Sequence, residues 1–358
     1  MATRDHGPAT TDISIIVPTW NGLELLKRFL PPLLAEVELY QGHRCGAAEV
    51  LVIDDASSDG TLQYLGSQPV RIVHRSVQGG FSCACNTGIW EARFPIVVLL
   101  NNDVRMAPGF LRALVGPLAD PAVFATTARI FEPESGLLAT AGKIGKFRRG
   151  FWSVYFNYDC KRSPGGGETK LLPSAYAVGG FCAFRTEQAR EWGGFDEIYS
   201  PFHWEDVDLS YRAWKRGWSV VYQPSAMGWH QAGSTIGRAF QNREVEIVAV
   251  RNRLLFHWKN LHDPVMLWQH VGMLLLLLLT RWLAGDVCFY RAFLGALRNW
   301  RSCLRGRRRE RSAVRRSDRA VMKLLHAFGA RPDIEIFRSR REVEQRCHER
   351  LRSPDYAQ

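Results

Sequence analysis

The sequence predicts an α/β fold: a mostly parallel β-sheet flanked by helices, followed by a helical, basic C-terminal region. In the N-terminal part of the chain, short apolar runs rich in β-branched residues alternate with helical patterns, which is typical of βαβ units. From about residue 243 onward the pattern is helical and rich in arginine. With 358 residues, of which 46% are hydrophobic, the chain can bury a sizeable core.

These patterns divide the chain into a flexible N-terminus at residues 1–11, an α/β domain at residues 12–240 and a helical, Arg-rich region at residues 241–358. The first residues contain no apolar stretch of the kind that marks a secretory signal. The eight cysteines are scattered without CxxC pairs, as expected for reduced thiols. We therefore expect a cytoplasmic protein.

The elements of the α/β domain follow from local patterns, because apolar β-branched runs predict strands and apolar residues at helical spacing predict helices. Along the first part of the chain, strands are expected at residues 13–17, 50–53, 70–73 and 96–100, and helices at 22–37, 61–65, 82–92 and 109–118. Further on, strands are expected at residues 176–184 and 218–222, the first with a Gly-Gly break, and a helix at 205–216 that Gly217 ends.

Acidic and amide residues follow several of the apolar runs. Asp54 and Asp55 come after VLVI, Asn101, Asn102 and Asp103 come after IVVLL, Glu205 and Asp206 open a predicted helix, and His230 lies farther along. The carboxyl ends of parallel strands meet at one edge of an open α/β sheet, where ligands bind. Carboxylates at such an edge can hold a divalent cation, and with it a nucleotide.

Each cluster also has a purely structural interpretation. Aspartates before turn residues such as SSDG favour turns because they bond their own backbone, and a Gly-Gly pair often forms a turn. Acids in a first helical turn stabilise the helix dipole. A single histidine beside a tryptophan is often a packed residue.

Seven motifs, in order over most of the first 230 residues, resemble bacterial glycosyltransferase family 2 enzymes of the GT-A fold, in the branch that includes rhamnosyltransferases of cell-surface polysaccharide assembly. The motifs are IIVPTWNG (15–22), VIDDASSDGT (52–61), QGGFSCACNTGI (78–89), LLNNDV (99–104), GGFDE (193–197), HWEDVDLSYR (203–212) and the segment around His230. The resemblance implies that residues 12–240 form a GT-A nucleotide-diphospho-sugar transferase domain.

The resemblance also implies roles for individual residues. On the nucleotide-sugar side it implies Pro18, Thr19, Asn21, Asp54, Asp55, Gly79, Gly80, Phe81, Asn86, Asn101 and Asn102. LLNNDV corresponds to the family's DxD element, with Asn101 in place of the first carboxylate. Asp103 would then be the main protein ligand of a Mg²⁺ or Mn²⁺ ion and His230 would complete the site, since imidazole suits Mn²⁺ better than Mg²⁺.

For catalysis, the resemblance implies inverting sugar transfer, in which a carboxylate accepts the proton of the attacking acceptor hydroxyl. Asp206 is the expected general base, and Glu205 would orient the base or the acceptor. Gly180, Phe181 and Trp204 are expected on the acceptor side, where the aromatic rings could stack on sugars, although aromatic residues usually belong to the core.

The expected function is therefore metal-assisted transfer of a hexosyl or deoxyhexosyl group from a nucleoside diphosphate sugar to a saccharide or polyprenyl-linked saccharide in cell-wall polysaccharide synthesis. One alternative is a non-catalytic GT-A-fold membrane scaffold, but Asp103 and Asp206, whose loss would mark it, are both present. A second alternative is a nucleic-acid-binding protein, but the basic region lacks interleaved aromatic residues on which bases could stack. The donor sugar and base, the acceptor hydroxyl and the oligomeric state are not defined by the sequence.

The net charge of +12 is concentrated in arginines at residues 281–319, a charge pattern that attracts anionic lipids as well as other polyanions. Residues 265–283 overlap the start of this basic region. They include the leucine run at 274–279, which has Gln269 and His270 before it and Arg281 after it. The uninterrupted part is shorter than the roughly 20 residues of a membrane span. We expect a helix in the interface of the inner face of the cell membrane; a buried helix and a crossing helix are the alternatives.

Overall fold

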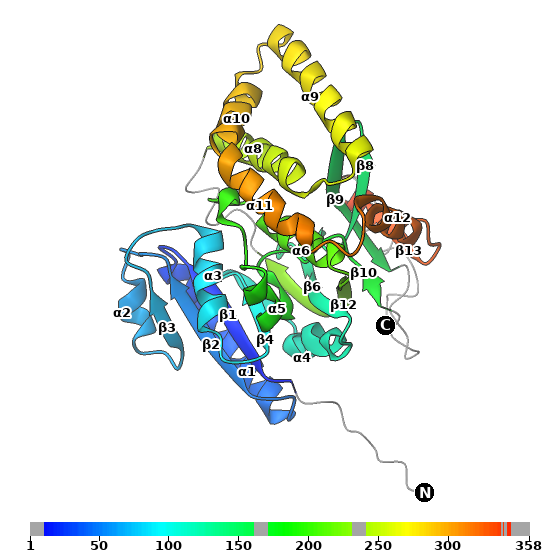
Figure 1. The fold of residues 1–358 in the computed structure, drawn as a ribbon. Coiled ribbons are helices and arrows are strands. Elements are labelled where there is room, and N and C mark those ends of the chain that lie inside the picture. The colour runs from blue at the N-terminus through cyan, green and yellow to red at the C-terminus, as the bar shows by residue number, and fades with distance from the viewer. Residues whose placement is uncertain (1–10, 161–170, 231–240, 338, 340–341, 345–358) are drawn as a thin grey trace, which may run out of the picture.

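The computed structural model describes residues 11–160, 171–230, 241–337, 339 and 342–344. The predicted flexible N-terminus, apart from residue 11, lies outside the described residues, and so does the segment just before the predicted boundary at 240/241. A large mixed sheet with helices on both faces forms one part of the molecule, and the C-terminal helices pack beside it (Figure 1).

The large sheet has the strand order β10-β12-β6-β11-β4-β1-β2-β3, with β5 paired to β12 and β7 to β6. Its strands are β1 (Ile13–Thr19), β2 (Ala48–Asp54), β3 (Arg71–His74), β4 (Ile96–Leu100), β5 (Val104–Met106), β6 (Val123–Phe131), β7 (Leu138–Thr140), β10 (Leu172–Pro173), β11 (Phe181–Arg185) and β12 (Ser219–His230). Strands β1 to β4 pair in parallel, whereas β11 runs antiparallel to β4 and β6. The predicted mostly parallel sheet is thus confirmed in its N-terminal half.

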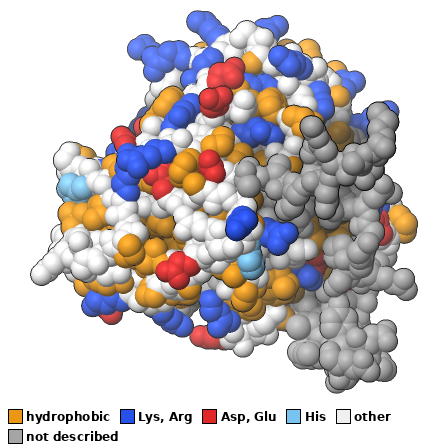
Figure 2. Space-filling model, turned by 90° about the horizontal axis from the view of Figure 1, so that it is seen from below, with side chains coloured by type: hydrophobic (Ala, Val, Ile, Leu, Met, Phe, Trp, Pro, Cys, Tyr) orange, Lys and Arg blue, Asp and Glu red, His pale blue; other side chains and the backbone are white. Residues whose placement is uncertain are grey.

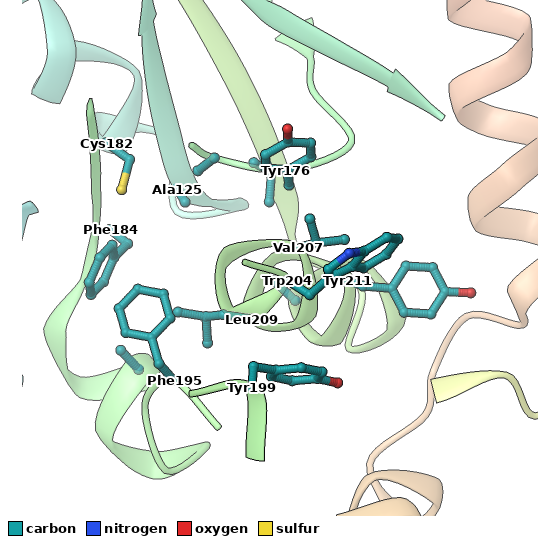
Figure 3. Close-up of a cluster of buried hydrophobic side chains, with 14 of the residues drawn as sticks. Ala125, Tyr176, Cys182, Phe184, Phe195, Tyr199, Trp204, Val207, Leu209 and Tyr211 are labelled. Carbon is teal, nitrogen blue, oxygen red and sulfur yellow. The ribbon is translucent and has the colours of Figure 1, made fainter. Parts of the chain in front are cut away.

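Two faces of the sheet carry two hydrophobic cores, because successive strand side chains point to opposite sides. Ile13, Ile15 and Val17 pack with α1 (Leu23–Gly42) and α4 (Phe110–Val115). Ile16 faces the other side, where α3 (Phe81–Glu91), α5 (Thr186–Glu191) and α6 (Glu205–Lys215) pack. Figure 3 shows the part of this second core around α6, which includes Trp204, Val207 and Tyr211.

Most predicted elements are present, with boundaries that tertiary contacts changed. The helix predicted at 61–65 is α2 (Thr61–Leu65), but the helix predicted to end at residue 37 runs to Gly42 with Pro31 and Pro32 inside it. The strand predicted at 218–222 continues to His230, past a register shift after Tyr222. The helix predicted at 109–118 ends at Val115 and continues as a 3₁₀ turn.

The strand predicted at 176–184 is wrong in its first half. Only Phe181–Arg185 forms a strand. Gly180 has a φ of +87°, a left-handed conformation that ends a strand and that glycine adopts without steric cost. The backbone N–H of Gly179 donates to Asp206 instead of to a neighbouring strand. Residues 176–180 therefore form a loop beside the first turn of α6.

The C-terminal region is helical, as predicted, but it shares the core of the α/β part. Its elements are α8 (Asn242–Asn260), α9 (Pro264–Leu283), α10 (Val287–Arg298), α11 (Trp300–Ser312), α12 (Asp318–Gly329) and β13 (Ile334–Phe337), which joins β8 (Gly142–Arg148) and β9 (Phe151–Cys160) in a small sheet. Leu255 and Phe256 of α8 and Val321 of α12 belong to the same cluster as Ile16. The region therefore packs into the same core as the α/β part.

Helix α9 is the exception, because most of it projects from the rest of the protein in a hairpin with α10 (Figure 1). It is long and apolar enough to cross a membrane, judged by length and composition alone, and 11% of its apolar window is buried. Only Met266 and His270 of this helix are buried. The alternative of a buried helix at residues 265–283 is therefore wrong.

Candidate active site

A cavity of about 620 Å³ lies at the carboxyl ends of β1 and β4 and against the first turn of α6. Most of the residues expected to form a site line it. These are Pro18, Thr19, Asp55, Gly80, Phe81, Asn101, Asn102, Asp103, Phe181, Trp204, Glu205, Asp206 and His230. The lining does not include Asn21, Asp54, Gly79, Asn86 or Gly180.

Asp55 and its neighbour Asp54 have different surroundings. The carboxylate of Asp55 accepts hydrogen bonds from the backbone N–H groups of Gly79 at 3.0 Å and Gly80 at 2.7 Å, and from Nε of Arg75 at 2.8 Å. Asp54 is fully buried, 2.8 Å from Nδ1 of His74. Asp55 therefore shapes the glycine loop at the cavity wall, whereas Asp54 stands behind it.

Asn21 and Asn86 also hold loops in place. Oδ1 of Asn21 accepts a hydrogen bond from the backbone N–H of Ser58 at 2.8 Å. The backbone of Asn21 is left-handed, with a φ of +46°. The amide of Asn86 donates to the carbonyl of Phe195 at 2.9 Å and its oxygen accepts from the N–H of the same residue at 2.8 Å. These hydrogen bonds join loops that are far apart in sequence. The motifs alone therefore could not show whether the two asparagines contact a ligand or hold loops in place.

Asp103 and His230 meet at the end of the sheet because β5 and β12 pair with Val104 opposite His230. Oδ1 of Asp103 lies 3.1 Å from Nε2 of His230. The ring of Phe181 packs edge-on against the imidazole, with 4.9 Å between ring centroids. Sequence reasoning expected Phe181 on the acceptor side, but the ring also supports His230.

The amides of the NND motif are tied to the neighbouring strand ends. Nδ2 of Asn102 donates to Oγ1 of Thr19 at 2.9 Å, and the backbone N–H of Asn101 donates to the carbonyl of Gly180. A Cβ at Gly180 would lie 2.2 Å from Oδ1 of Asn101. Gly180 therefore lies against Asn101 behind the cavity wall, where there is no space for a side chain, and it does not line the cavity.

The donor set fits a hard divalent cation shared with a ligand. Within the described part of the chain, no group of three or more His, Cys, Asp or Glu side chains could hold a metal on its own. One carboxylate and one imidazole facing a cavity instead match an ion that takes its other ligands from water and from phosphate oxygens. Asp103 and His230 fit this pattern because their donor atoms already face each other.

Glu205 and Asp206 begin α6 beside the cavity. The carboxylate of Asp206 accepts from the N–H groups of Gly179 at 3.0 Å and Val207 at 2.8 Å. Burial raises the pKa of Glu205 to about 8, with the charge of Asp206 adding to the effect. Burial also raises the pKa of Asp206, against the opposing effect of those N–H groups.

Trp204, expected on the acceptor side, is 3% exposed. Its ring packs 5.0 Å from that of Phe256, between α6 and α8. It lines the cavity as part of the core and does not form an open stacking platform. Trp204 immediately precedes α6 and has a φ of +78°.

Sequence reasoning missed several lining residues. They are Trp20, Gln78, Ala84, Tyr176, Val178, Gly179, Pro201, Phe202, His203, Val207 and Ala249. Trp20, Gln78, Ala84, His203 and Val207 lie within the quoted motifs, and Pro201 and Phe202 directly precede one, so the motifs could have indicated them. Ala249 of α8 had no signal. Lys143 of β8 was also missed; its ammonium lies 5.7 Å from the ring of Tyr176 and donates to Asn157 at 2.6 Å. Burial lowers the pKa of Lys143 to about 8, while Asp206 opposes that shift.

Comparison with known proteins now adds to this geometry. The sequence profile of Glycosyl transferase family 2 matches residues 14–187. A pre-mycofactocin glycosyltransferase of Mycobacterium tuberculosis is 26% identical over 230 residues, which cover 63% of this chain and 43% of that protein. An N-acetylglucosaminyl-diphospho-decaprenol L-rhamnosyltransferase of the same species is 29% identical over 250 residues, covering 64% of this chain and 79% of that protein. The chain thus spans less than half the length of the first of these relatives.

Among solved structures, GalNAc-T7 with UDP, GalNAc and Mn²⁺ superposes with a TM-score of 0.53 at 18% identity, over 71% of this chain and 49% of that one. This likeness shows the fold, and the predicted GT-A architecture is confirmed. The profile match covers the strands and loops that carry Asp55 and Asp103. Over residues 14–187, the chain is therefore similar to glycosyltransferase family 2.

Proposed function

We propose that this protein is an inverting glycosyltransferase that moves a hexosyl or deoxyhexosyl group from a nucleoside diphosphate sugar to a hydroxyl of a carbohydrate acceptor. One observation carries the proposal: a single cavity is lined by Asp55, by Asp103 and His230, and by Asp206. These residues come from strand ends and a helix start that are distant in sequence. A nucleotide, a diphosphate and an acceptor each have a chemically suitable partner there.

For the acceptor we propose a polyprenyl-linked saccharide of cell-envelope polysaccharide assembly. The relative with 79% of its length covered is named for rhamnosyl transfer to N-acetylglucosaminyl-diphospho-decaprenol, which supports this class. The cavity wall contributed by Phe81, Tyr176 and Phe202 is apolar and aromatic, and such surfaces pack well against sugar rings.

In the proposed reaction, Asp206 accepts the proton of the acceptor hydroxyl as its oxygen attacks the anomeric carbon, and the bond to the diphosphate breaks on the opposite face. The N–H groups of Gly179 and Val207 hold the carboxylate in place. Because α6 begins at Glu205, the positive end of the helix dipole also favours the ionised base.

Asp103 and His230 are the residues that would hold Mn²⁺ or Mg²⁺. When bound, such an ion neutralises charge on the departing diphosphate. The presence of Mn²⁺ and UDP in the GalNAc-T7 structure is consistent with this assignment. Asp55 contributes by keeping the Gly79 and Gly80 loop in the shape that borders the nucleotide.

The function can be tested by screening nucleotide sugars for thermal stabilisation in Mn²⁺ and in EDTA, because a ligand of the folded state raises its melting temperature. Stabilising donors are then assayed for transfer to synthetic polyprenyl-linked saccharides. We expect at least one donor to stabilise the wild type only with metal. The exposed Glu38 on α1 gives a matched control, since Glu38→Gln should respond as the wild type does. A protein that no nucleotide sugar stabilises would contradict the proposal and favour a scaffold.

We also propose that the hairpin of α9 and α10 holds the enzyme on the cytoplasmic face of an anionic membrane. Its large exposed apolar side chains are Val265, Trp268, Leu275, Leu276, Leu279, Trp282, Leu283, Val287, Leu294 and Leu297. At the opposite end of the molecule, hydrophobic side chains are interspersed with charged ones (Figure 2). Most of the large exposed apolar side chains in the described part of the chain lie on the hairpin.

The charge around the hairpin favours anionic lipid. Arg291, Arg298, Arg301 and Arg305 are exposed on α10 and α11, and each basic residue near such a surface contributes about 1 kcal/mol. Other arginines of the basic region are used inside the fold, since Arg307 donates to the carbonyl of Trp258 at 2.9 Å. This internal use weakens the nucleic-acid alternative.

Vesicle sedimentation tests the membrane proposal. Replacing Trp268, Leu279 and Trp282 together by serine should reduce sedimentation with anionic vesicles several-fold, while Trp90→Ser, which changes an exposed tryptophan of α3, should not. High salt or carbonate should release the wild type from membranes. A requirement for detergent would show that α9 crosses the bilayer, and equal sedimentation of both variants would remove the hairpin from the interaction.

A further inference from the structure

Glu205 has a hydrogen-bonding capacity that the proposed reaction does not use. Its side chain lines the cavity, yet the residue is 6% exposed. Backbone N–H groups at the start of the helix lower the pKa of its carboxyl group, but burial outweighs them. Its Oε2 is buried and finds no hydrogen-bond partner among the residues that the structure describes. A buried polar atom of this kind is costly unless a ligand satisfies it.

The charges that face Glu205 are negative. They belong to Asp206 and Asp208 of the same helix. The thiol of Cys85, on α3, is neutral because burial raises its pKa. Two cations at the same helix are paired with another acid: Lys259 and Arg212 lie 2.9 and 2.7 Å from Asp208. Two adjacent carboxyl groups in one buried site do not both ionise readily, and their environments decide which one does.

Asp206 is the better placed of the two to carry the charge. It accepts two backbone N–H hydrogen bonds at its own oxygens, and the positive charge of Lys143 favours its ionised form. Burial lowers the pKa of His203, so this imidazole carries a charge only in acid. Among the described residues, no cation is one of the main influences on the pKa of Glu205. The proton of the pair therefore belongs on Glu205, with its O–H on the oxygen that finds no protein partner.

We propose that Glu205 works as a neutral carboxylic acid whose O–H donates a hydrogen bond to a carbohydrate oxygen in the cavity, beside the ionised Asp206. The proposal rests on the proposed glycosyl transfer for the identity of the ligand, but not for the protonation state. The oxygen can belong to the donor sugar or to the acceptor. In either case Glu205 binds and orients one substrate, and Asp206 alone takes the proton.

Infrared difference spectroscopy tests the protonation state without any substrate. Near neutral pH, the spectrum of the wild type minus that of Glu205→Gln should contain a carboxylic-acid C=O stretch, and the band should disappear as pH rises above the pKa of Glu205. Asp206→Asn should keep the band, which provides a second variant if Glu205→Gln folds poorly. A carboxylate band in its place would overturn the proposal, whatever the enzyme's activity.

Glu36 supplies a matched control for the spectrum. It is buried to the same 6% exposure, but both its oxygens accept backbone N–H hydrogen bonds, from Gly109 and Leu111 at 3.0 Å. Burial raises its pKa as well. Glu36→Gln should retain the band assigned to Glu205, so that band can be separated from any signal of this second buried glutamate.

Kinetics identifies the partner oxygen once substrates are known. Glutamine keeps an N–H donor, so Glu205→Gln should lose less activity than Glu205→Ala, for which the loss of a single hydrogen bond predicts roughly tenfold. A rise in KM for the nucleotide sugar would assign the oxygen to the donor, and a rise in KM for the saccharide would assign it to the acceptor. Equal losses in both variants would mean that an ionised glutamate is required.

Discussion

Helix α6 has two sides that treat buried charge in opposite ways. On the cavity side, burial raises the pKa values of Glu205 and Asp206. On the side toward the C-terminal helices, burial also opposes the charge of Asp208, but Lys259 and Arg212 outweigh it and hold its pKa well below the usual value. Paired charges attach the helix to its neighbours, whereas incompletely neutralised acids remain available to a ligand.

The pairing reaches across the whole C-terminal region. Lys259 of α8 bridges Asp208 and Asp196, and Lys215 at the end of α6 bonds Asp318 of α12 at 2.7 Å. Tyr211 donates to the same Asp318 at 2.6 Å. The acids of the cavity can therefore keep a fixed position because the other side of their helix is held at several points.

The largest expected effect comes from breaking the cavity side. Asp206→Asn keeps the shape of the side chain and removes only its basicity, so turnover should fall by on the order of 10²- to 10⁴-fold. Thermal stability and nucleotide affinity should change little. Steady-state kinetics and calorimetry measure these separately, and near-normal turnover would move the base assignment away from Asp206.

Breaking the other side should affect stability first. Lys259→Met leaves Asp208 buried with one partner fewer, and uncompensated buried charges cost about 3–5 kcal/mol. Urea denaturation should show this loss. The double variant Lys259→Met with Asp208→Asn should recover part of it, because it removes the charge that was left behind. No recovery would indicate that packing of the lysine stem, rather than charge, is responsible.

At the sheet edge, the expected effect on binding of a nucleoside diphosphate depends on whether metal is present. Asp103→Ala removes the carboxylate that faces His230, so calorimetry should find that Mn²⁺ no longer strengthens binding of a nucleoside diphosphate. Affinity measured in EDTA should stay near the wild-type value. If the wild type binds equally well in EDTA and in Mn²⁺, the assignment of Asp103 and His230 as metal ligands is wrong.

The last expected effect is a difference in pH dependence between the two sides. Because the folded-state pKa of Glu205 is raised from 4.5 to about 8, the unfolded state loses its proton first, and Glu205 lowers stability as pH rises through that range. Asp208 affects stability in the opposite direction. Its stabilising contribution is present above the pKa of the unfolded state and is lost as acid protonates the folded state.

Denaturation at several pH values measures this difference. The stability of Glu205→Gln relative to the wild type should increase between pH 4.5 and about 8. Asp208→Asn should be less stable than the wild type at neutral pH, and the deficit should shrink in acid. Parallel curves for the wild type and Glu205→Gln would contradict the raised pKa.

Local patterns in the chain were sufficient for the strands that end near Asp55 and Asp103 and for the helix that Glu205 opens. Apolar alternation and helix-start residues act over a few neighbours, so β1, β2, β4 and α6 could be predicted from short stretches of sequence. The order of the motifs then predicted the family, and most of the residues that line the cavity.

Long-range packing decided the rest. His230 meets Asp103 only because β12 pairs with β5, and Asn86 faces Phe195 rather than the cavity. The same packing gives Asp208 its cations from α6 and α8 and leaves Glu205 without one. A carboxylate in a sequence motif has no defined pKa until burial and neighbouring charges are set, and both depend on contacts between residues far apart in the chain.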